Sequence, residues 1–357
     1  MSGRGKLRVV VLFGGRSGEH EVSVASARSV MAALDRERFE VLPVAIARSG
    51  AWLTVEETRA ALARIAHRSL AAIEAEGEGL LARPAVLEVL AEADIVFPVL
   101  HGAYGEDGTV QGLLELADVP YVGAGVTASA IGMDKSMQKA IWRQAGLPVV
   151  EHMVVLRSAV ERDAAAVAQE VERRFAYPVF VKPAGSGSSV GVSKVRSRED
   201  LAEAFAEAGR WDRKLLVERA VRGREIECAV LGNDEPHASP LGEIVPKAEF
   251  YTYEAKYVDA STELIAPADL PPDLTREIQA LAIAAYRAID CAGMARVDFF
   301  VEDGQPLLNE INTIPGFTSI SMYPRLWQLT GMSYTELLTR LIELGLERYA
   351  ETHRRPR

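Results

Sequence analysis

Apolar runs of strand length and helical patterns alternate through the first third of the chain. Continuous apolar runs occupy residues 7–13, 39–46 and 95–100, and a helical pattern covers about 21–34. Strands that alternate with helices indicate a parallel α/β sheet with functional loops at the strand carboxyl ends. We therefore predict an N-terminal α/β unit up to residue 125. Within it, residues 55–92 are expected to form additional helices, and residues 65–79 are expected to form a solvated helix or loop.

A second unit begins after residue 125 and has a less regular order of elements. Helices are predicted near 129–144, 199–208, 273–292 and 334–349, and strands at 178–183, 215–218 and 225–231. A chain of 357 residues is too long for one ordinary core, so two or three domains are expected.

A β-hairpin near the C-terminus carries the most informative polar pattern. Two apolar runs flank Asp303-Gly304, which is a strong turn signal. A three-residue loop over 303–305 would set Asp298 opposite Glu310, with Arg296 and Asn312 on the same face. Two carboxylates and an amide oxygen would suit Mg²⁺ beside a phosphate. A two-residue loop would instead set Asp298 opposite Asn309, and an ordinary hairpin with one solvated polar face is the alternative.

Composition narrows the class of protein. A net charge of −10 argues against nucleic-acid binding and favours an acidic enzyme, and a hydrophobic content of 48% is typical of a globular protein. The two cysteines, Cys228 and Cys291, lie in apolar contexts, which favours a reducing compartment. Neither a signal core nor a membrane-spanning run is present in the sequence, so a cytoplasmic location is expected.

A glycine- and serine-rich loop, residues 184–191, follows the predicted strand that ends at Lys182-Pro183. Glycines let backbone N–H groups approach phosphate oxygens, and Ser188 and Ser189 add donors. The loop is not the GxxxxGK[ST] motif, and a loop without a ligand is the alternative.

Three other polar segments lie where ligands usually bind. After the first strand, Glu19 either faces a cationic ligand or favours the N-terminus of the next helix. His101, with Glu106 and Asp107 close behind, follows a strand at the edge where open α/β sheets bind ligands, although a lone histidine is often structural. Glu218 and Glu225 flank Arg222-Gly223 and would accept hydrogen bonds from ribose hydroxyls or an adenine amino group. The alternative is that both are solvated charges at a loop.

Two loops complete the candidates. Residues 247–266 have the length of a lid, in which Lys256 and Tyr257 would face a ligand. The alternative is a surface loop without a function. In the segment after the hairpin, Gly316 and the hydroxyls up to Ser321 suit carboxylate binding.

Taken together, these segments closely resemble the D-alanine–D-alanine ligases of the ATP-grasp superfamily. The resembling motifs occur in family order at residues 14–23, 101–112, 133–135, 181–191, 253–257, 296–298 and 309–321. The resemblance implies an α/β domain over 1–125, which precedes a two-lobed α+β ATP-grasp fold with a central lobe over 126–218 and a C-terminal lobe over 219–357. It also implies ATP and D-alanine as substrates, two Mg²⁺ ions that Mn²⁺ can replace, a homodimer, a role in peptidoglycan precursor synthesis, and neither a nucleic-acid nor a membrane partner.

The resemblance also implies the roles of particular residues. The metal ligands would be Asp298, Glu310 and Asn312. The ATP-binding residues would be Lys135, Lys182, Ser188, Ser189, Glu218, Val221, Glu225, Phe250 and Lys256. The amino-acid sites would be formed by Glu19, His101, Glu106, Gly316, Ser319 and Ser321, with Arg296 and the Gly316 backbone at the tetrahedral intermediate. Glu19, Ser188 and Tyr257 would form a hydrogen-bonded group that joins the lid to the substrate.

Two positions depart from the family pattern, and three alternatives stay open. Ser186 stands where some members carry a charge, and Asn309 where an apolar residue packing on adenine is expected. Tyr257 favours D-alanine as the second substrate. The alternatives are a D-alanine–D-lactate or D-alanine–D-serine ligase, another ATP-grasp ligase, and a nucleotide-binding regulator without catalysis. The resemblance also favours the three-residue hairpin loop, because that loop pairs Asp298 with Glu310.

Overall fold

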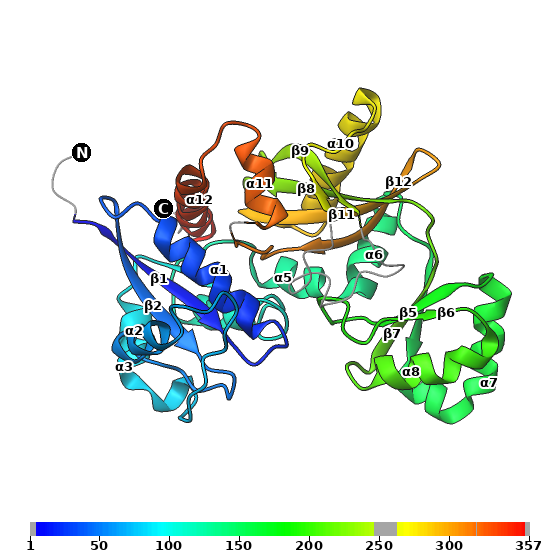
Figure 1. The fold of residues 1–357 in the computed structure, drawn as a ribbon, viewed down its shortest axis with the longest axis horizontal. Coiled ribbons are helices and arrows are strands. Elements are labelled where there is room, and N and C mark those ends of the chain that lie inside the picture. Colours follow the sequence, from blue (N-terminus) through cyan, green and yellow to red (C-terminus); the bar gives the residue numbers. More distant parts are fainter. Residues whose placement is uncertain (1–4, 246–262, 319, 354–357) are drawn as a thin grey trace.

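The computed structural model describes residues 5–245, 263–318 and 320–353, which are built around three sheets (Figure 1). The N-terminal sheet is parallel, in the order β2-β1-β3, and consists of β1 (Leu7–Gly14), β2 (Phe39–Ile46) and β3 (Ile95–Val99). It is covered by α1 (His20–Ala33), α2 (Val55–Arg64), α3 (Pro84–Ala91) and α4 (Thr109–Leu116). The strands are almost wholly buried, as their continuous apolar sequences require. The predicted parallel α/β unit is confirmed.

The segment 65–79 is not solvated along its whole length, so that expectation was partly wrong. It has no regular helix, but Ala71 and Ile73 are buried. The backbone N–H of Ile73 donates to His20 Nε2 at 2.9 Å, and His20 Nδ1 lies 2.7 Å from the carbonyl oxygen of Gly15. A buried histidine therefore ties this segment to the loop after β1.

The central sheet is antiparallel, in the order β4-β7-β5-β6. Its strands are β4 (His152–Leu156), β5 (Val179–Pro183), β6 (Ser193–Val195) and β7 (Lys214–Arg219), and α7 (Arg157–Arg174) and α8 (Leu201–Gly209) pack on it. Sequence analysis missed β4, β6 and α7. The helix is rich in charge and buries only Ala168 and Val171, so its apolar face is too narrow to identify from periodicity.

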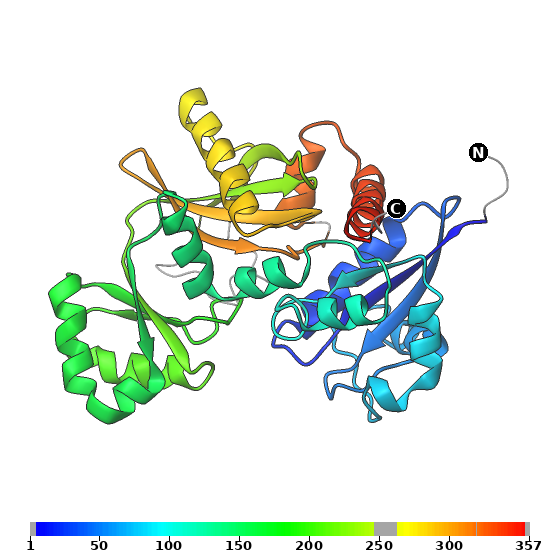
Figure 2. The same cartoon turned by 180° about the vertical axis from the view of Figure 1, so that it is seen from behind.

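The C-terminal sheet is antiparallel, in the order β10-β9-β8-β11-β12. It contains β8 (Arg224–Leu231), β9 (His237–Val245), β10 (Glu263–Ile265), β11 (Met294–Glu302) and β12 (Gln305–Asn312). Helices α10 (Pro272–Ala288) and α11 (Met322–Gln328) pack against it, whereas α12 (Tyr334–Thr352) shares a core with the N-terminal sheet (Figures 1 and 2). The last helix thus joins the two ends of the chain.

The helix predicted over 129–144 is two helices, α5 (Val126–Met133) and α6 (Lys135–Gln144). Asp134 breaks them with an extended ψ of 98°, and its side chain caps α6 by accepting from the N–H groups of Ser136 and Met137. Both helices pack on the C-terminal sheet at β12 (Figure 2). Trp142 of α6 also donates from Nε1 to the carbonyl oxygen of Ala285 on α10. The domain limits at residues 126 and 219 remain a prediction.

The hairpin of β11 and β12 corrects the predicted turn. Asp303 and Gly304 form a two-residue turn with φ values of 51° and 77°, and Glu302 pairs with Gln305. A β-bulge then skips Asn309, because Phe299 pairs with Leu308 whereas Asp298 pairs with Glu310. The three-residue loop was wrong, yet Asp298 does lie opposite Glu310, because the bulge makes up the missing residue.

Candidate active site

A cavity of about 1520 Å³ lies where the three sheets approach one another. It is lined by every described residue that sequence analysis proposed for the site: Glu19, His101, Glu106, Lys135, Lys182, Ser188, Ser189, Glu218, Val221, Glu225, Arg296, Asp298, Glu310, Asn312, Gly316 and Ser321. Phe250, Lys256, Tyr257 and Ser319 lie outside the described residues.

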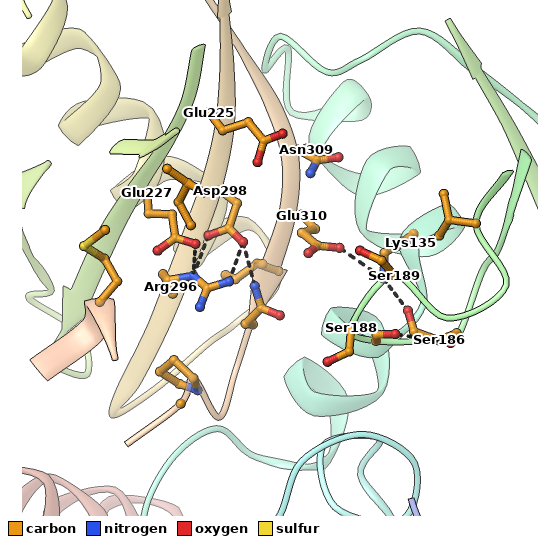
Figure 3. Close-up of a pocket in the computed structure, with 18 of the residues that line it drawn as sticks. Lys135, Ser186, Ser188, Ser189, Glu225, Glu227, Arg296, Asp298, Asn309 and Glu310 are labelled. Carbon is orange, nitrogen blue, oxygen red and sulfur yellow. Dashed lines mark hydrogen bonds and ion pairs between the residues drawn. The ribbon is translucent and has the colours of Figure 1, made fainter. Parts of the chain in front are cut away.

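Arg296 is held by two carboxylates on neighbouring strands. Its Nε and Nη2 atoms each lie 2.7 Å from an oxygen of Asp298, and Nε lies 3.1 Å from Glu227 Oε1 (Figure 3). Burial opposes the charge, but Asp298 and Glu227 raise the pKa of Arg296 well above its ordinary value. Sequence analysis missed Glu227, although strand alternation puts it on the same face of β8 as Glu225.

The proposed metal ligands form a mixed donor set. Asp298 and Glu310 face each other across the hairpin, and Asn312 Nδ2 donates to Asp298 Oδ2 at 3.0 Å. Within the described ranges, no group of three or more His, Cys, Asp or Glu side chains could hold a metal ion. Two carboxylates and one amide fit Mg²⁺ only if phosphate oxygens complete the coordination, which is how this ion is often held in nucleotide sites.

Lys135 connects the hairpin to the glycine-rich loop. Its Nζ lies 3.1 Å from Glu310 Oε2 and donates to the carbonyl oxygen of Ser186 at 2.8 Å (Figure 3). Burial opposes the charge, but Glu310 raises the pKa of Lys135. The ammonium therefore stays charged between the carboxylate and the loop, where it can meet a phosphate.

The glycine-rich loop between β5 and β6 reaches the segment between β1 and α1. Ser188 and Ser189 have φ values of 48° and 59°, and the Ser188 hydroxyl donates to Glu19 Oε1. A Cβ at Gly187 would lie 2.9 Å from Glu19 Oε2, so a side chain there would require the Glu19 carboxylate to shift. Two of the three residues proposed to join the lid to the substrate are thus in contact.

His101 is buried under the same end of the cavity. Its Nδ1 lies 3.1 Å from the carbonyl oxygen of Ile314 and 3.4 Å from Glu106 Oε1, and its Nε2 lies 3.3 Å from Ser26 Oγ. Burial lowers the pKa of His101, but Glu106 and Glu19 more than offset this and raise it. Ser26, which sequence analysis missed, also accepts from the N–H of Phe317 and so links α1 to the segment after β12.

Gly316, Thr318 and Ser321 lie close together at the cavity wall. Ser321 Oγ accepts from the N–H of Thr318 at 3.0 Å and lies 2.7 Å from Thr318 Oγ1. A Cβ at Gly316 would approach Ser321 Oγ to 3.0 Å. Gly316, Thr318 and Ser321 all line the cavity, where backbone N–H and hydroxyl groups are donors suited to a carboxylate.

The other end of the cavity is dominated by Glu218. Its Oε2 lies 2.6 Å from Lys182 Nζ, and its Oε1 lies 3.2 Å from Lys139 Nζ. Burial opposes ionisation of Glu218, yet the two ammonium groups hold its pKa below the usual value. Lys139 was missed, although its place four residues after Lys135 puts both on one face of α6. The Oδ1 atom of the bulge residue Asn309 is buried nearby and has no hydrogen-bond partner in the part of the chain that the structure describes.

A parallel α/β domain followed by two lobes around a polar cavity, with lysines and carboxylates on facing walls, defines an ATP-grasp ligase, which confirms the predicted fold class. Residues 8–124 match the family model described as "D-ala D-ala ligase N-terminus", and residues 141–343 match "D-ala D-ala ligase C-terminus". The chain belongs to the D-alanine–D-alanine ligase family.

Individual relatives extend over the whole chain. The D-alanine–D-alanine ligase of Chloroherpeton thalassium is 50% identical over 97% of this chain and 98% of its own length. That of Heliobacterium modesticaldum is 50% identical over 98% of this chain and 97% of its own length. Among solved structures, the ligase from Coxiella burnetii has a TM-score of 0.81 at 38% identity, with 98% of this chain and 96% of that chain covered. A D-Ala:D-Ser ligase from Enterococcus faecalis has a TM-score of 0.80 at 34% identity, with 95% of this chain and 99% of that chain covered.

Proposed function

We propose that this protein joins two molecules of D-alanine to form D-alanyl-D-alanine, with conversion of ATP to ADP and phosphate, as a step of peptidoglycan precursor synthesis. The observation that carries the proposal is the single cavity lined by Lys135, Lys182, Asp298, Glu310 and Arg296. A carboxylate is a poor electrophile, and phosphorylation of the first D-alanine converts it to an acyl phosphate that an amine can attack.

Each wall of the cavity has a proposed task in this reaction. Lys135, Lys182 and the loop serines bind the ATP phosphates, and Glu218, Val221 and Glu225 meet adenine and ribose. Asp298, Glu310 and Asn312 hold Mg²⁺ or Mn²⁺ together with phosphate oxygens, which supplies positive charge to the transferring phosphoryl group. Phe250 and Lys256, on the segment outside the described residues, are proposed to complete the ATP site.

The amino-acid end has the complementary task. Glu19 binds the ammonium of the first D-alanine, and His101, positioned by Glu106, lies beside it. Arg296 and the Gly316 backbone stabilise the charge that develops when the second amine attacks. Ser321, with Ser319, binds the carboxylate of the second D-alanine. Because an acyl phosphate hydrolyses in water, the contact of Ser188 with Glu19 is proposed to close the site together with Tyr257.

Ligation to D-serine is the second candidate, because a D-Ala:D-Ser ligase shares this fold with a TM-score of 0.80. Ligation to D-lactate is the third. We prefer D-alanine because Tyr257 accompanies dipeptide formation in the resembling family. We also propose that the protein acts in the cytoplasm as a homodimer. The described residues include no helix long and apolar enough to cross a membrane.

A coupled assay separates these candidates. Phosphate release is measured with ATP and D-alanine alone, and then with D-serine or D-lactate added as second substrate. The proposal predicts full turnover with D-alanine alone and little stimulation by the other two. If D-alanine alone gives no turnover and D-serine or D-lactate restores it, the proposed second substrate is wrong.

A further inference from the structure

A lysine with no assigned task is buried beside the nucleotide end of the cavity. Lys139 lies on α6 with 0% of its surface exposed. Its Nζ lies 3.2 Å from Glu218 Oε1, and burial lowers the pKa of Lys139 to about 8. A buried ammonium is unfavourable unless a carboxylate pairs with it, so a specific task is expected of this residue.

The pair spans two parts of the molecule. Glu218 lies on β7 of the central sheet, opposite Phe180 on β5 and His152 on β4. Lys139 instead belongs to α6. In this helix Gln138 Oε1 accepts from the N–H of Ile311 on β12, and Trp142 Nε1 donates to a carbonyl oxygen of α10, so α6 is fixed to the C-terminal part of the molecule. The Lys139 side chain therefore reaches Glu218 from a different part of the molecule.

Glu218 contacts two ammonium groups, and these differ in how far they can move when a ligand binds. Lys182 also lines the cavity, and in the proposed function its ammonium shifts towards the phosphates when the nucleotide enters, which weakens its 2.6 Å contact with Glu218. Lys139 does not line the cavity and has no exposed surface, so it cannot follow a phosphate. Lys139 is therefore the cation that stays in place beside Glu218 throughout binding.

We propose that Lys139 is a positioning residue that keeps Glu218 ionised and aimed at the adenine base while Lys182 is released to the phosphates. The inference rests on the proposed binding of ATP and on the role of Glu218 in it. Without Lys139, Glu218 would retain Lys182, and the protein would lose a base contact and a phosphate contact together.

The test uses the full chain and direct binding of ADP, measured by calorimetry, for Lys139→Met, Glu218→Gln and Lys214→Met. Lys214 pairs with Asp134 and so joins the same strand, β7, to the start of α6, but it does not line the cavity. We expect Lys139→Met to raise the Kd for ADP by about tenfold and to narrow the preference for ADP over GDP. Lys214→Met should lower Tm and leave the Kd for ADP unchanged.

The outcomes separate this inference from the proposed function. If Glu218→Gln weakens ADP binding but Lys139→Met does not, the role of Lys139 is refuted and the nucleotide site stands. If Glu218→Gln has no effect either, the proposed nucleotide site itself is wrong. If Lys214→Met weakens ADP binding as much as Lys139→Met, Lys139 merely ties the lobes together.

A second measurement needs no variant. The charged or titratable groups around Lys139 are Glu218, Lys182, His152 and Glu310. As the pH rises through about 8, Lys139 loses its proton and Glu218 is left with Lys182 alone. The Kd of the unaltered protein for ADP should therefore rise between pH 7 and 9.5, and a flat profile would overturn the proposal.

Discussion

At the scale of single residues, charge pairing explains most of the site. Arg296 is positioned from two strands by Asp298 and Glu227, and both contacts are shielded from water. A metal ion bound to Asp298 would compete with Arg296 for the same oxygens, and Glu227 would then keep the guanidinium in place. Motif residues such as Arg296 and Glu310 could be predicted from sequence. Glu227 and Lys139 were missed because their partners lie on distant segments.

Arg296→Ala should separate catalysis from binding. Removing a donor aimed at developing charge typically lowers kcat by about 10²–10³-fold, whereas ADP binding should stay measurable because the proposed nucleotide contacts come from other residues. Arg296→Lys, which keeps the charge but not the two-pronged geometry, is the matched control and should fall in between. Undiminished turnover in Arg296→Ala would contradict the assigned role. A nucleotide-binding regulator would instead show no turnover in either protein.

At the scale of elements, the hairpin shows what sequence reasoning could and could not supply. The strands and the turn at Asp303-Gly304 were predictable from local residue types. The bulge at Asn309 was not, because it is set by pairing with β11 and not by its own sequence. Similarly, the polar helix α7 carries too weak a periodicity, whereas the N-terminal strands were predictable because both of their faces are buried.

The turn itself gives a clean stability test. Gly304 has a φ of 77°, and a Cβ there would meet nothing within 4 Å, so the penalty for Gly304→Ala is purely conformational. We expect a loss of about 1 kcal/mol in the free energy of unfolding, with kcat and KM unchanged. Gly304→Asn, which tolerates the left-handed region, should lose less. Equal stability of all three proteins in urea titrations would argue against the two-residue turn.

At the scale of the whole molecule, the site exists only where separate parts meet. Glu19 lies between β1 and α1, Ser188 on the loop between β5 and β6, and Arg296 on β11. Helix α12 packs the end of the chain back onto the N-terminal core (Figure 1). This arrangement predicts that contacts between parts control access of water to the acyl phosphate, more than they control the chemistry itself.

Ser188→Ala tests that expectation. Loss of the hydroxyl removes the bond to Glu19, so the glycine-rich loop should close less firmly over the cavity. Water would then hydrolyse part of the acyl phosphate, which releases phosphate without forming dipeptide. The ratio of phosphate released to dipeptide formed should therefore rise above one. Ser197→Ala, at the half-buried cap of a short helix on the central lobe, is the control and should keep the ratio at one. A ratio of one in Ser188→Ala would show that the contact does not exclude water.

The most direct test of the central claim follows the oxygen atoms of the first substrate. D-alanine labelled with oxygen-18 in its carboxyl group is incubated with the protein and ATP, and the released phosphate and the dipeptide are analysed by mass spectrometry. Attack of the carboxylate on ATP, followed by displacement of phosphate by the second amine, must carry one labelled oxygen into each phosphate. The account predicts labelled phosphate and D-alanyl-D-alanine in equal amounts. Unlabelled phosphate without dipeptide would contradict it.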